Sequence, residues 1–388
     1  MKRSLVLYFL SEFFLSFGIG IIQYAQPFFY ASAHIGDEKI GYLFAINAFC
    51  GGCSALIVGP IADRFGASRM FKIGTLLIGV GDLGSSVGYA WPLWMGTAAI
   101  AGVGGSMLTS TENVVLSSLM VGRERSHLIS RFTALYMFLI GAGIVCGGFL
   151  VLGVGLQWTM ILGSLIALVA PVIRFFVKAP DSRREKVLQV PSKPLMFMAS
   201  YAILFGIAGG LFNQFATLIL SERYHATTST TSIVYAVSIF MVSIGSFLVR
   251  PLIQKLKQQA TLLLAFILSA VSMLLFIVAM STGVFVGIYF LLTISTAVPP
   301  PIIDAMFLDF VHTSEFSQMF GMRVFGTRVG NAIGSSMGGG LLKGDHYDWL
   351  MLISSGFFII SYVYLQFIRR PLHRYRTERD ESHGTSVS

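Results

Sequence analysis

A small set of acidic and basic side chains lies within long apolar stretches of the chain. The carboxyl groups in this set are Glu12, Asp82, Glu112 and Asp304, and the guanidinium groups are Arg131, Arg323 and Arg328. Because a charge inside a bilayer is costly, such residues mark the path of an ion or a substrate. Burial favours the neutral form of a carboxyl group and a nearby Arg favours the charged form, so such a pair can couple protonation to movement. We expect proton coupling or gating at these residues. Static ion pairs that only hold helices together are the alternative.

Two pairs of these charged residues occur at matching places in the two halves of the chain. Glu112-Asn113 aligns with Ile303-Asp304, and Arg131 aligns within one residue of Arg323. Just before Asp304 stands Pro299-Pro300-Pro301, which removes backbone donors and predicts a broken helix. Carbonyl groups freed in this way are tolerated only beside protein or in a wet cavity. A broken helix beside a buried carboxyl group is a candidate proton or cation site.

Arg328 is expected near the centre of the bilayer. It follows Ser317, where an apolar stretch begins, by a helical rise of about 16 Å. It could move relative to Asp304 as part of a gate. Alternatively, its guanidinium group could bind an anionic substrate, since its geometry suits carboxylate and phosphate.

The composition indicates that lipid is the solvent of this chain. Of its 388 residues, 55% are hydrophobic and 12% are charged, whereas a soluble domain averages about 25% charged residues. Twelve segments are long and apolar enough to cross a bilayer. They are 5–30, 40–62, 70–90, 92–120, 127–152, 157–177, 195–220, 231–253, 260–281, 283–311, 317–342 and 347–368. The chain is therefore predicted to be an all-α membrane protein with twelve transmembrane helices.

The net charge of +9 orients the chain and does not indicate nucleic-acid binding. With a cytoplasmic N-terminus, Lys and Arg fall almost entirely on one side, and the opposite side holds Lys39, Arg223 and Lys343. This is the positive-inside distribution, and it agrees with an even number of spans. We expect both termini in the cytoplasm.

The longest connection divides the chain into two halves that look like degenerate copies. Val58–Arg64 lines up with Val249–Lys255, and Phe17-Gly18-Ile19 resembles Phe205-Gly206-Ile207. We expect a first six-helix bundle over 1–177, a cytoplasmic linker over 178–194 and a second bundle over 195–368. The charged, Ser-rich tail 369–388 is predicted to be disordered. Parallel six-span repeats place a substrate site near the midplane, between the halves.

Residues 59–69 form a charged, glycine-punctuated segment between two apolar runs. The segment resembles the loop between spans two and three of the major facilitator superfamily. The residues that match the pattern of that loop are Gly59, Asp63, Arg64, Gly66 and Arg69. The resemblance implies two pseudo-symmetric six-helix bundles and secondary transport by alternating access. It also implies a cytoplasmic latch, with Gly66 allowing a tight turn and Asp63 approaching a helix N-terminus of the other half. The alternative is a solvated loop whose Arg residues only set topology.

The resemblance further implies which residues line a substrate cavity, because spans one, four, seven and ten do so in this family. Polar and aromatic candidates on these and neighbouring spans are Gln23, Tyr24, Gln26, Phe28, Asn113, Asn213, Gln214 and Asn331. The expected substrate is a small organic molecule, exported in exchange for protons. Proton-coupled uptake, possibly of an organic anion, is the alternative. Drug-exporting members carry an Arg early in span four, and Leu93–Gly105 has none, so export is not indicated by motif.

Other classes are less consistent with the sequence. Gly334–Gly338 matches Gly-x-Ser-x-Gly, but the histidines fall in loops, tails or span ends, and small residues suit close helix packing. A channel or sensor remains a rival. Cys50, Cys53 and Cys146 lie in predicted spans and are expected to pack there, so no metal or cofactor is expected. We expect a monomer in a bacterial inner membrane, with no nucleic-acid partner.

Overall fold

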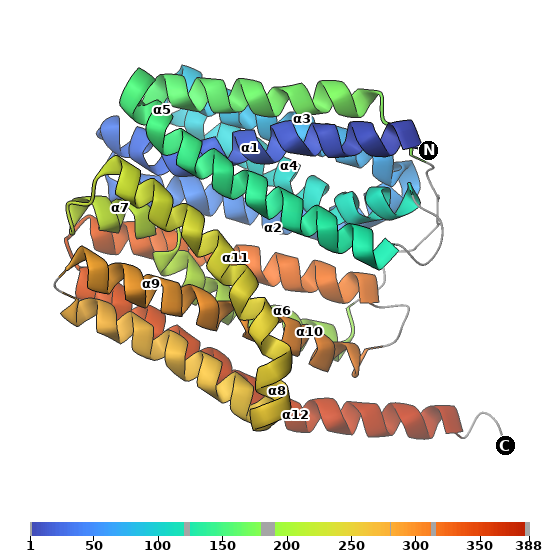
Figure 1. Cartoon of the computed structure of the whole chain (residues 1–388). Helices are drawn as coiled ribbons and strands as arrows, with labels where there is room; N and C mark the ends of the chain where they lie inside the picture. The colour runs from blue at the N-terminus through green and yellow to red at the C-terminus, as the bar shows by residue number, and fades with distance from the viewer. Residues whose placement is uncertain (1, 120–124, 180–190, 280, 312–315, 385–388) are drawn as a thin grey trace.

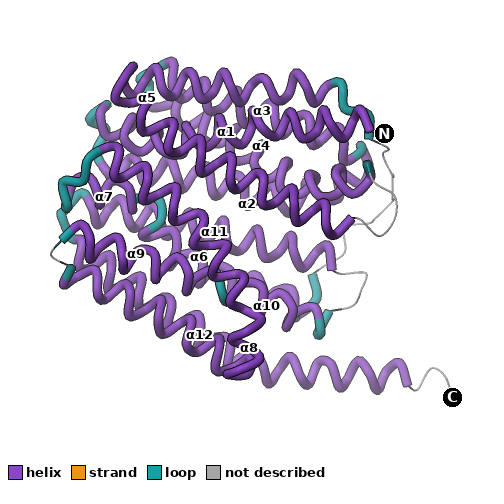
Figure 2. Tube along the Cα trace, viewed as in Figure 1, coloured by secondary structure: helices purple, strands orange, loops and turns teal. Residues whose placement is uncertain are grey.

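The structure is a computed structural model that describes residues 2–119, 125–179, 191–279, 281–311 and 316–384. These residues form helices and no strands (Figure 2). The helices of the first half are α1 (Lys2–Ser32), α2 (Asp37–Phe65), α3 (Ala67–Val87), α4 (Trp91–Ser118) and α5 (Arg125–Phe175). Those of the second half are α6 (Lys193–Phe212), α7 (Ala216–Glu222), α8 (Thr228–Val278), α9 (Thr282–Ala297), α10 (Pro299–Leu308), α11 (Phe316–Leu342) and α12 (Tyr347–Gly384).

These helices make twelve membrane-crossing segments, as the sequence predicts. The long helices α5 and α8 each contain one non-helical residue, Gly155 with φ 81° and Lys257 with φ 65°, where the chain reverses direction. Each of them therefore provides two spans. Conversely, α6 with α7 and α9 with α10 each form one broken span. The second break lies at Val298, directly before the three prolines.

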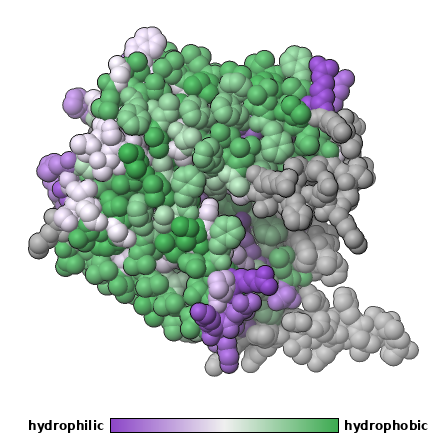
Figure 3. All heavy atoms as spheres, viewed as in Figure 1, coloured by the Kyte–Doolittle hydropathy of each residue, from purple (hydrophilic) through white to green (hydrophobic). Residues whose placement is uncertain are grey.

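The outer surface of the bundle is apolar. Phe247 is 81% exposed and Phe175 is 74% exposed, which would be unfavourable in water. Figure 3 shows hydrophobic residues over most of one face, with hydrophilic residues near its edges. The side chains on this surface are suited to contact lipid.

The two halves form two pseudo-symmetric bundles, and both chain termini lie at the same end of the molecule (Figure 1). We call this the terminal end and the opposite one the far end. In the first half, α1 packs closely on α5, where a Cβ added to Gly20 would lie 3.0 Å from the Cα of Gly143. In the second half, α6 packs in the same way on α11, where a Cβ added to Gly206 would lie 3.1 Å from the Cα of Gly330. The repeated contact supports an internal duplication.

The halves meet at the far end. A Cβ on Gly41 of α2 would lie 3.0 Å from the Cα of Gly339 of α11. Nearby, the rings of Phe44 and Phe215 pack edge to face with centroids 6.2 Å apart. The Gly334–Gly338 run thus lies in a close helix contact, as its small residues indicate.

The segment 59–69 is not a hairpin loop. Residues 59–65 form the last turns of α2, and α3 begins at Ala67, so Gly66 alone makes the turn. Its φ of 100° is a conformation that glycine adopts most easily. Arg64 and Arg69 are exposed. The side chain of Asp63 lies outside the described residues, so the latch stays a prediction.

The tail differs from its predicted disorder. α12 continues to Gly384 and extends beyond the bundle (Figure 1). Arg and Glu are good helix formers, so a charged segment can extend an existing helix without a new nucleation step. Most of the predicted linker, residues 180–190, lies outside the described residues.

The glycine contacts yield a stability prediction. Gly206→Ala would place a Cβ 2.5 Å from the carbonyl oxygen of Thr327, so α6 and α11 must separate. We expect the free energy of unfolding to fall by about 1–3 kcal/mol, measured as a lower melting temperature in detergent. The matched control is Gly287→Ala, because a Cβ there has no neighbour within 4 Å. Equal loss in both variants would contradict the packing argument.

Candidate functional site

A central cavity of about 850 Å³ lies between the two halves, a volume within the usual range for small-molecule sites. The first half contributes side chains from α1 to α5. The second half contributes Gln214 and a row from α11 that includes Arg323, Thr327, Arg328 and Asn331. Its lining residues run from Tyr30, Phe44 and Thr97 near the far end to Glu112 and Arg323 toward the terminal end. The contacts between α2 and α11 lie at the far end.

An ion pair between Glu12 and Arg174 lies beside this cavity and is buried. Arg174 Nη2 donates to Glu12 Oε2 at 2.6 Å, and the Arg174 side chain has no exposed surface. Its other nitrogens donate to Ser11 Oγ and Thr75 Oγ1. The guanidinium carbon lies 4.0 Å from the centre of the Phe71 ring, a cation–π distance. The pair therefore joins α1, α3 and the second span of α5.

Arg174 is a residue that the sequence reasoning missed. It belongs to the predicted span 157–177 but was counted among the cytoplasmic charges that orient the chain, because it stands near the end of that span. An Arg near a helix end can extend its side chain to the membrane surface. Here it instead folds into the bundle, toward the carboxylate of Glu12. Its place inside a predicted span was the available signal.

Glu112 on α4 lies beside Glu12, so the two carboxyl groups form a pair. Its carboxyl group lies within hydrogen-bonding range of Glu12, and both line the cavity. Tyr8 donates to the backbone carbonyl of Glu112 at 3.3 Å. Ser16 donates to Glu12 Oε1 at 2.5 Å. Glu12 therefore has a counter-charge in Arg174, whereas the carboxyl of Glu112 faces another carboxyl.

Asp304 and Arg323 form the corresponding group in the second half. Arg323 Nε lies 3.2 Å from Asp304 Oδ1, but the angles do not make this contact a hydrogen bond. The buried hydroxyl of Tyr201 lies near both groups and has no hydrogen-bond partner among the described residues. Arg323 lines the cavity. The broken span thus places Asp304 at an ion pair with a cavity residue, although Asp304 itself is not among the lining residues.

Arg328 reaches from α11 into the first half. A Cβ added to Gly51 of α2 would lie 2.5 Å from its Nη1, and one on Gly105 of α4 would lie 3.5 Å from its Nη2. The guanidinium group thus occupies space that only glycines leave free. Across the described residues, no hydrogen bond or ion pair holds it.

Asp82 on α3 lines the same cavity and is 9% exposed. Within the described part of the chain, its carboxyl group makes no ion pair. Tyr30, which accepts from Gln26 Nε2 at 3.2 Å, stands close by. Asp82 and Arg328 are therefore an acidic and a basic group of the cavity, and neither has an ion-pair partner among the described residues.

The remaining predicted cavity residues divide into two groups. Gln23, Gln26, Gln214 and Asn331 line the cavity. Tyr24, Phe28 and Asn213 are not among its lining residues. Tyr24 is fully buried and donates to the carbonyl of Thr228 on α8 at 2.6 Å, and Phe28 packs on Tyr24.

Tyr24 and Phe28 therefore belong to the contact between the halves, because the aromatic face of α1 turns toward α8. The side chains of Arg131 and Asn113 lie outside the described residues. Asn47 also lines the cavity and donates to the carbonyl of Ala98 at 3.1 Å.

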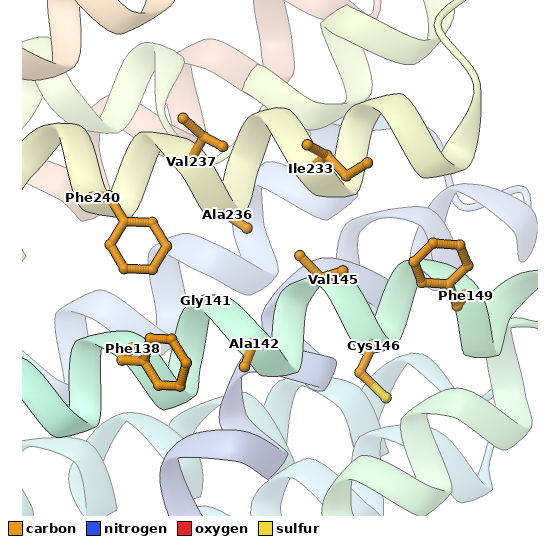
Figure 4. Close-up of a pocket in the computed structure, with 10 residues that line it drawn as sticks. All are labelled: Phe138, Gly141, Ala142, Val145, Cys146, Phe149, Ile233, Ala236, Val237 and Phe240. Atoms are coloured by element: carbon orange, nitrogen blue, oxygen red, sulfur yellow. The ribbon is translucent and has the colours of Figure 1, made fainter.

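A smaller pocket of about 550 Å³ lies between α5 and α8. Figure 4 shows that its side chains are apolar, with Phe138 and Phe240 at one end and Phe149 at the other. It offers no charge to bind a polar group. The central cavity is the better candidate for the functional site.

One ion pair within the described residues joins the two halves, at the far end. Lys343 Nζ donates to Glu38 Oε2 at 2.6 Å. This hydrogen bond raises the pKa of Lys343, which lies just beyond α11. The pair is exposed to solvent, so it contributes little to stability.

The buried and exposed ion pairs yield opposite predictions. Arg174→Gln leaves the Glu12 carboxylate buried without its counter-charge, so we expect a loss of about 3–5 kcal/mol in the free energy of unfolding. Lys343→Gln should leave the melting temperature close to that of the wild type, because solvent screens the exposed pair. Thermal unfolding in detergent measures both. An Arg174→Gln protein that melts with the wild type would contradict the structural role of the buried pair.

Comparison with known proteins agrees with this architecture. The sequence profile of the Major Facilitator Superfamily matches residues 8–200 and again residues 196–387. Multidrug resistance protein 2 of Bacillus subtilis (strain 168) is 25% identical and aligns over 92% of this chain and 93% of its own length. Quinolone resistance protein NorA of Staphylococcus aureus (strain N315) is 24% identical over 38% of each chain.

Among solved structures, the nucleoside transporter NupG has the same fold. It superposes with a TM-score of 0.74 and covers 94% of this chain and 99% of its own, at 10% identity. The two profile matches correspond to the two bundles, and together they span nearly the whole sequence. The chain therefore belongs to the Major Facilitator Superfamily.

Proposed function

We propose that this protein is a secondary active transporter that exports a small organic molecule in exchange for protons. The observation that carries the proposal is a central cavity between two bundles, with paired carboxyl groups on its wall. Transporters of this architecture bind substrate near the midplane, between the repeats. The names of two relatives, a multidrug and a quinolone resistance protein, favour export.

The arrangement of Glu12 and Glu112 supports proton coupling. Two ionised carboxylates accept hydrogen bonds but cannot donate one, so carboxyl groups this close need a shared proton. Glu12 is paired with Arg174. Glu112 has no ion pair among the described residues, which makes it the candidate proton carrier. Tyr8 and Tyr136 are the other titratable side chains nearby.

Asp304 supplies a second carboxyl at the matching place of the other half. Its contact with Arg323 is close but poorly aligned for a hydrogen bond. Movement of α11 relative to the broken span would change this contact. Release of Arg323 would favour protonation of Asp304, which couples proton uptake to the conformational change.

The closed far end supports a direction for the cycle. If the positive-inside distribution places the terminal end in the cytoplasm, the contacts between α2 and α11 close the side away from the cytoplasm. The protein would then be in the state that takes up substrate from the cell. Both termini would be cytoplasmic, and the membrane would be the inner membrane of a bacterium.

Uptake of an organic anion by proton symport is a second candidate. The observation that favours it is Arg328, a cavity guanidinium without a counter-charge among the described residues. Guanidinium groups bind carboxylate and phosphate with well-defined geometry. Transport assays in both directions separate the two candidates.

The proton role is tested by isosteric substitutions. Glu112→Gln and Asp304→Asn should abolish accumulation driven by a pH gradient in membrane vesicles, because neither amide can release a proton. Binding and substrate exchange without a gradient should persist. Inside-out vesicles should accumulate substrate if the protein exports it, and right-side-out vesicles if it imports it.

The matched control is Asp348→Asn, which removes a carboxylate that is 65% exposed and lies outside the cavity. It should transport like the wild type. Full gradient-driven accumulation by both Glu112→Gln and Asp304→Asn would refute the proton role of these carboxyls.

A further inference from the structure

We propose that the central cavity binds a zwitterionic amphiphile, with the cationic group of the substrate at Asp82 and its anionic group at Arg328. The inference rests on the proposed transport function and names the chemical class of the substrate. It follows from a comparison of the charged cavity residues that have a partner among the described residues with those that have none.

The charged groups that line the cavity fall into two sets. Glu12 is paired with Arg174, Glu112 with Glu12, and Arg323 with Asp304. Asp82 and Arg328 line the same cavity. Within the described residues, neither has an ion pair. A charge in a low-dielectric cavity without a partner is unfavourable, and a ligand of opposite charge removes that cost.

The surroundings of Arg328 keep its guanidinium free for a ligand. Gly51 and Gly52 on α2 and Gly105 on α4 surround it, and a side chain at Gly51 would collide with it. These glycines leave room for the Arg but supply no carboxylate. Asn331, one turn further along α11, also lines the cavity and can add an amide donor.

Asp82 is enclosed by polar side chains that cannot neutralise it. Ser85 uses its hydroxyl on the backbone carbonyl of Asp82, not on its carboxylate. Tyr30 and Thr97 also line this part of the cavity, and both are neutral. A substrate ammonium group would therefore meet one carboxylate and several hydroxyl groups.

The distance between the two charges follows from the packing of α3 on α4. A Cβ on Gly81, next to Asp82, would lie 2.8 Å from backbone atoms of Thr97 and Ala101. The guanidinium group of Arg328 lies at the level of Gly105, which is on α4 together with Thr97 and Ala101. At the rise of an α-helix, the two charges are about 6–12 Å apart along the helix axis. A rigid aromatic spacer with charges at opposite ends spans this distance.

The apolar wall between the two charges favours an amphiphile over a small polar zwitterion. Ile22, Ala98 and Ala101 line the cavity together with Leu43 and Phe44. An aromatic or aliphatic body would bury its surface there, at roughly 25 cal/mol per Å² removed from water.

The test compares three forms of one probe with the purified full-length protein. The probes are 4′-(aminomethyl)biphenyl-4-carboxylic acid, its methyl ester, which keeps only the cation, and its N-acetyl derivative, which keeps only the anion. We expect the zwitterion to bind at least about tenfold more tightly than either derivative, measured by calorimetry at pH 7.

The variants assign each charge. Arg328→Gln should weaken binding of the zwitterion about tenfold and leave the affinity for the ester unchanged. Asp82→Asn should weaken binding of the zwitterion and leave the affinity for the N-acetyl form unchanged. Arg223→Gln, a change of the same kind outside the cavity, should alter none of the three affinities. The probe series on the wild-type protein keeps the test valid if a variant does not fold.

Equal affinity for the three probes, tighter binding of either derivative, or no binding at all overturns the inference. Zwitterion-selective binding without any gradient-driven flux supports the inference but rejects the proposed transport function. Gradient-driven flux of the zwitterion that is insensitive to both Arg328→Gln and Asp82→Asn rejects the inference and leaves the transport function in place.

Discussion

The cost of a charge inside the membrane is the constraint on which the rest of this structure depends. Arg174 cannot remain charged within the bundle unless Glu12, Ser11 and Thr75 satisfy it, and that requirement ties α1, α3 and α5 together. The same pair fixes Glu12 at the wall of the cavity, opposite Glu112 on α4. The ion pair thus stabilises the first bundle and holds the Glu12 carboxyl group beside that of Glu112. Removal of either partner would leave the other buried and unpaired.

Close contacts through glycine give each half its shape. Without a hydrophobic driving force between helices in lipid, association depends on van der Waals packing, and small residues let backbones approach. The contact of α1 with α5 and that of α6 with α11 repeat this solution in the two halves. Similar contacts join α2 to α11 at the far end, and the cavity lies between the two halves. Two bundles joined in this way suit a mechanism in which one moves against the other.

Hydropathy predicted the spans well because every backbone group in lipid must be satisfied within the segment, so each span has to be a long apolar helix. The break before Asp304 was predictable for an equally local reason, since proline removes a donor. Gly66 was foreseen as a tight turn, yet the surrounding segment proved helical on both sides. The tail was misjudged because charge and polarity indicate solvation, which a helix that extends into solvent satisfies as well as a disordered chain.

The sequence by itself determined how often the chain crosses the membrane, which residues place a charge within a span, and where helices break. These properties depend on composition and on neighbours along the chain. Only the tertiary structure decided that Glu12 meets Arg174, that Tyr24 and Phe28 face α8, and that Asp82 and Arg328 share one cavity. A helix that is apolar on most sides carries little information about which side faces a neighbour. Its rotation is set by packing against helices that are distant in sequence.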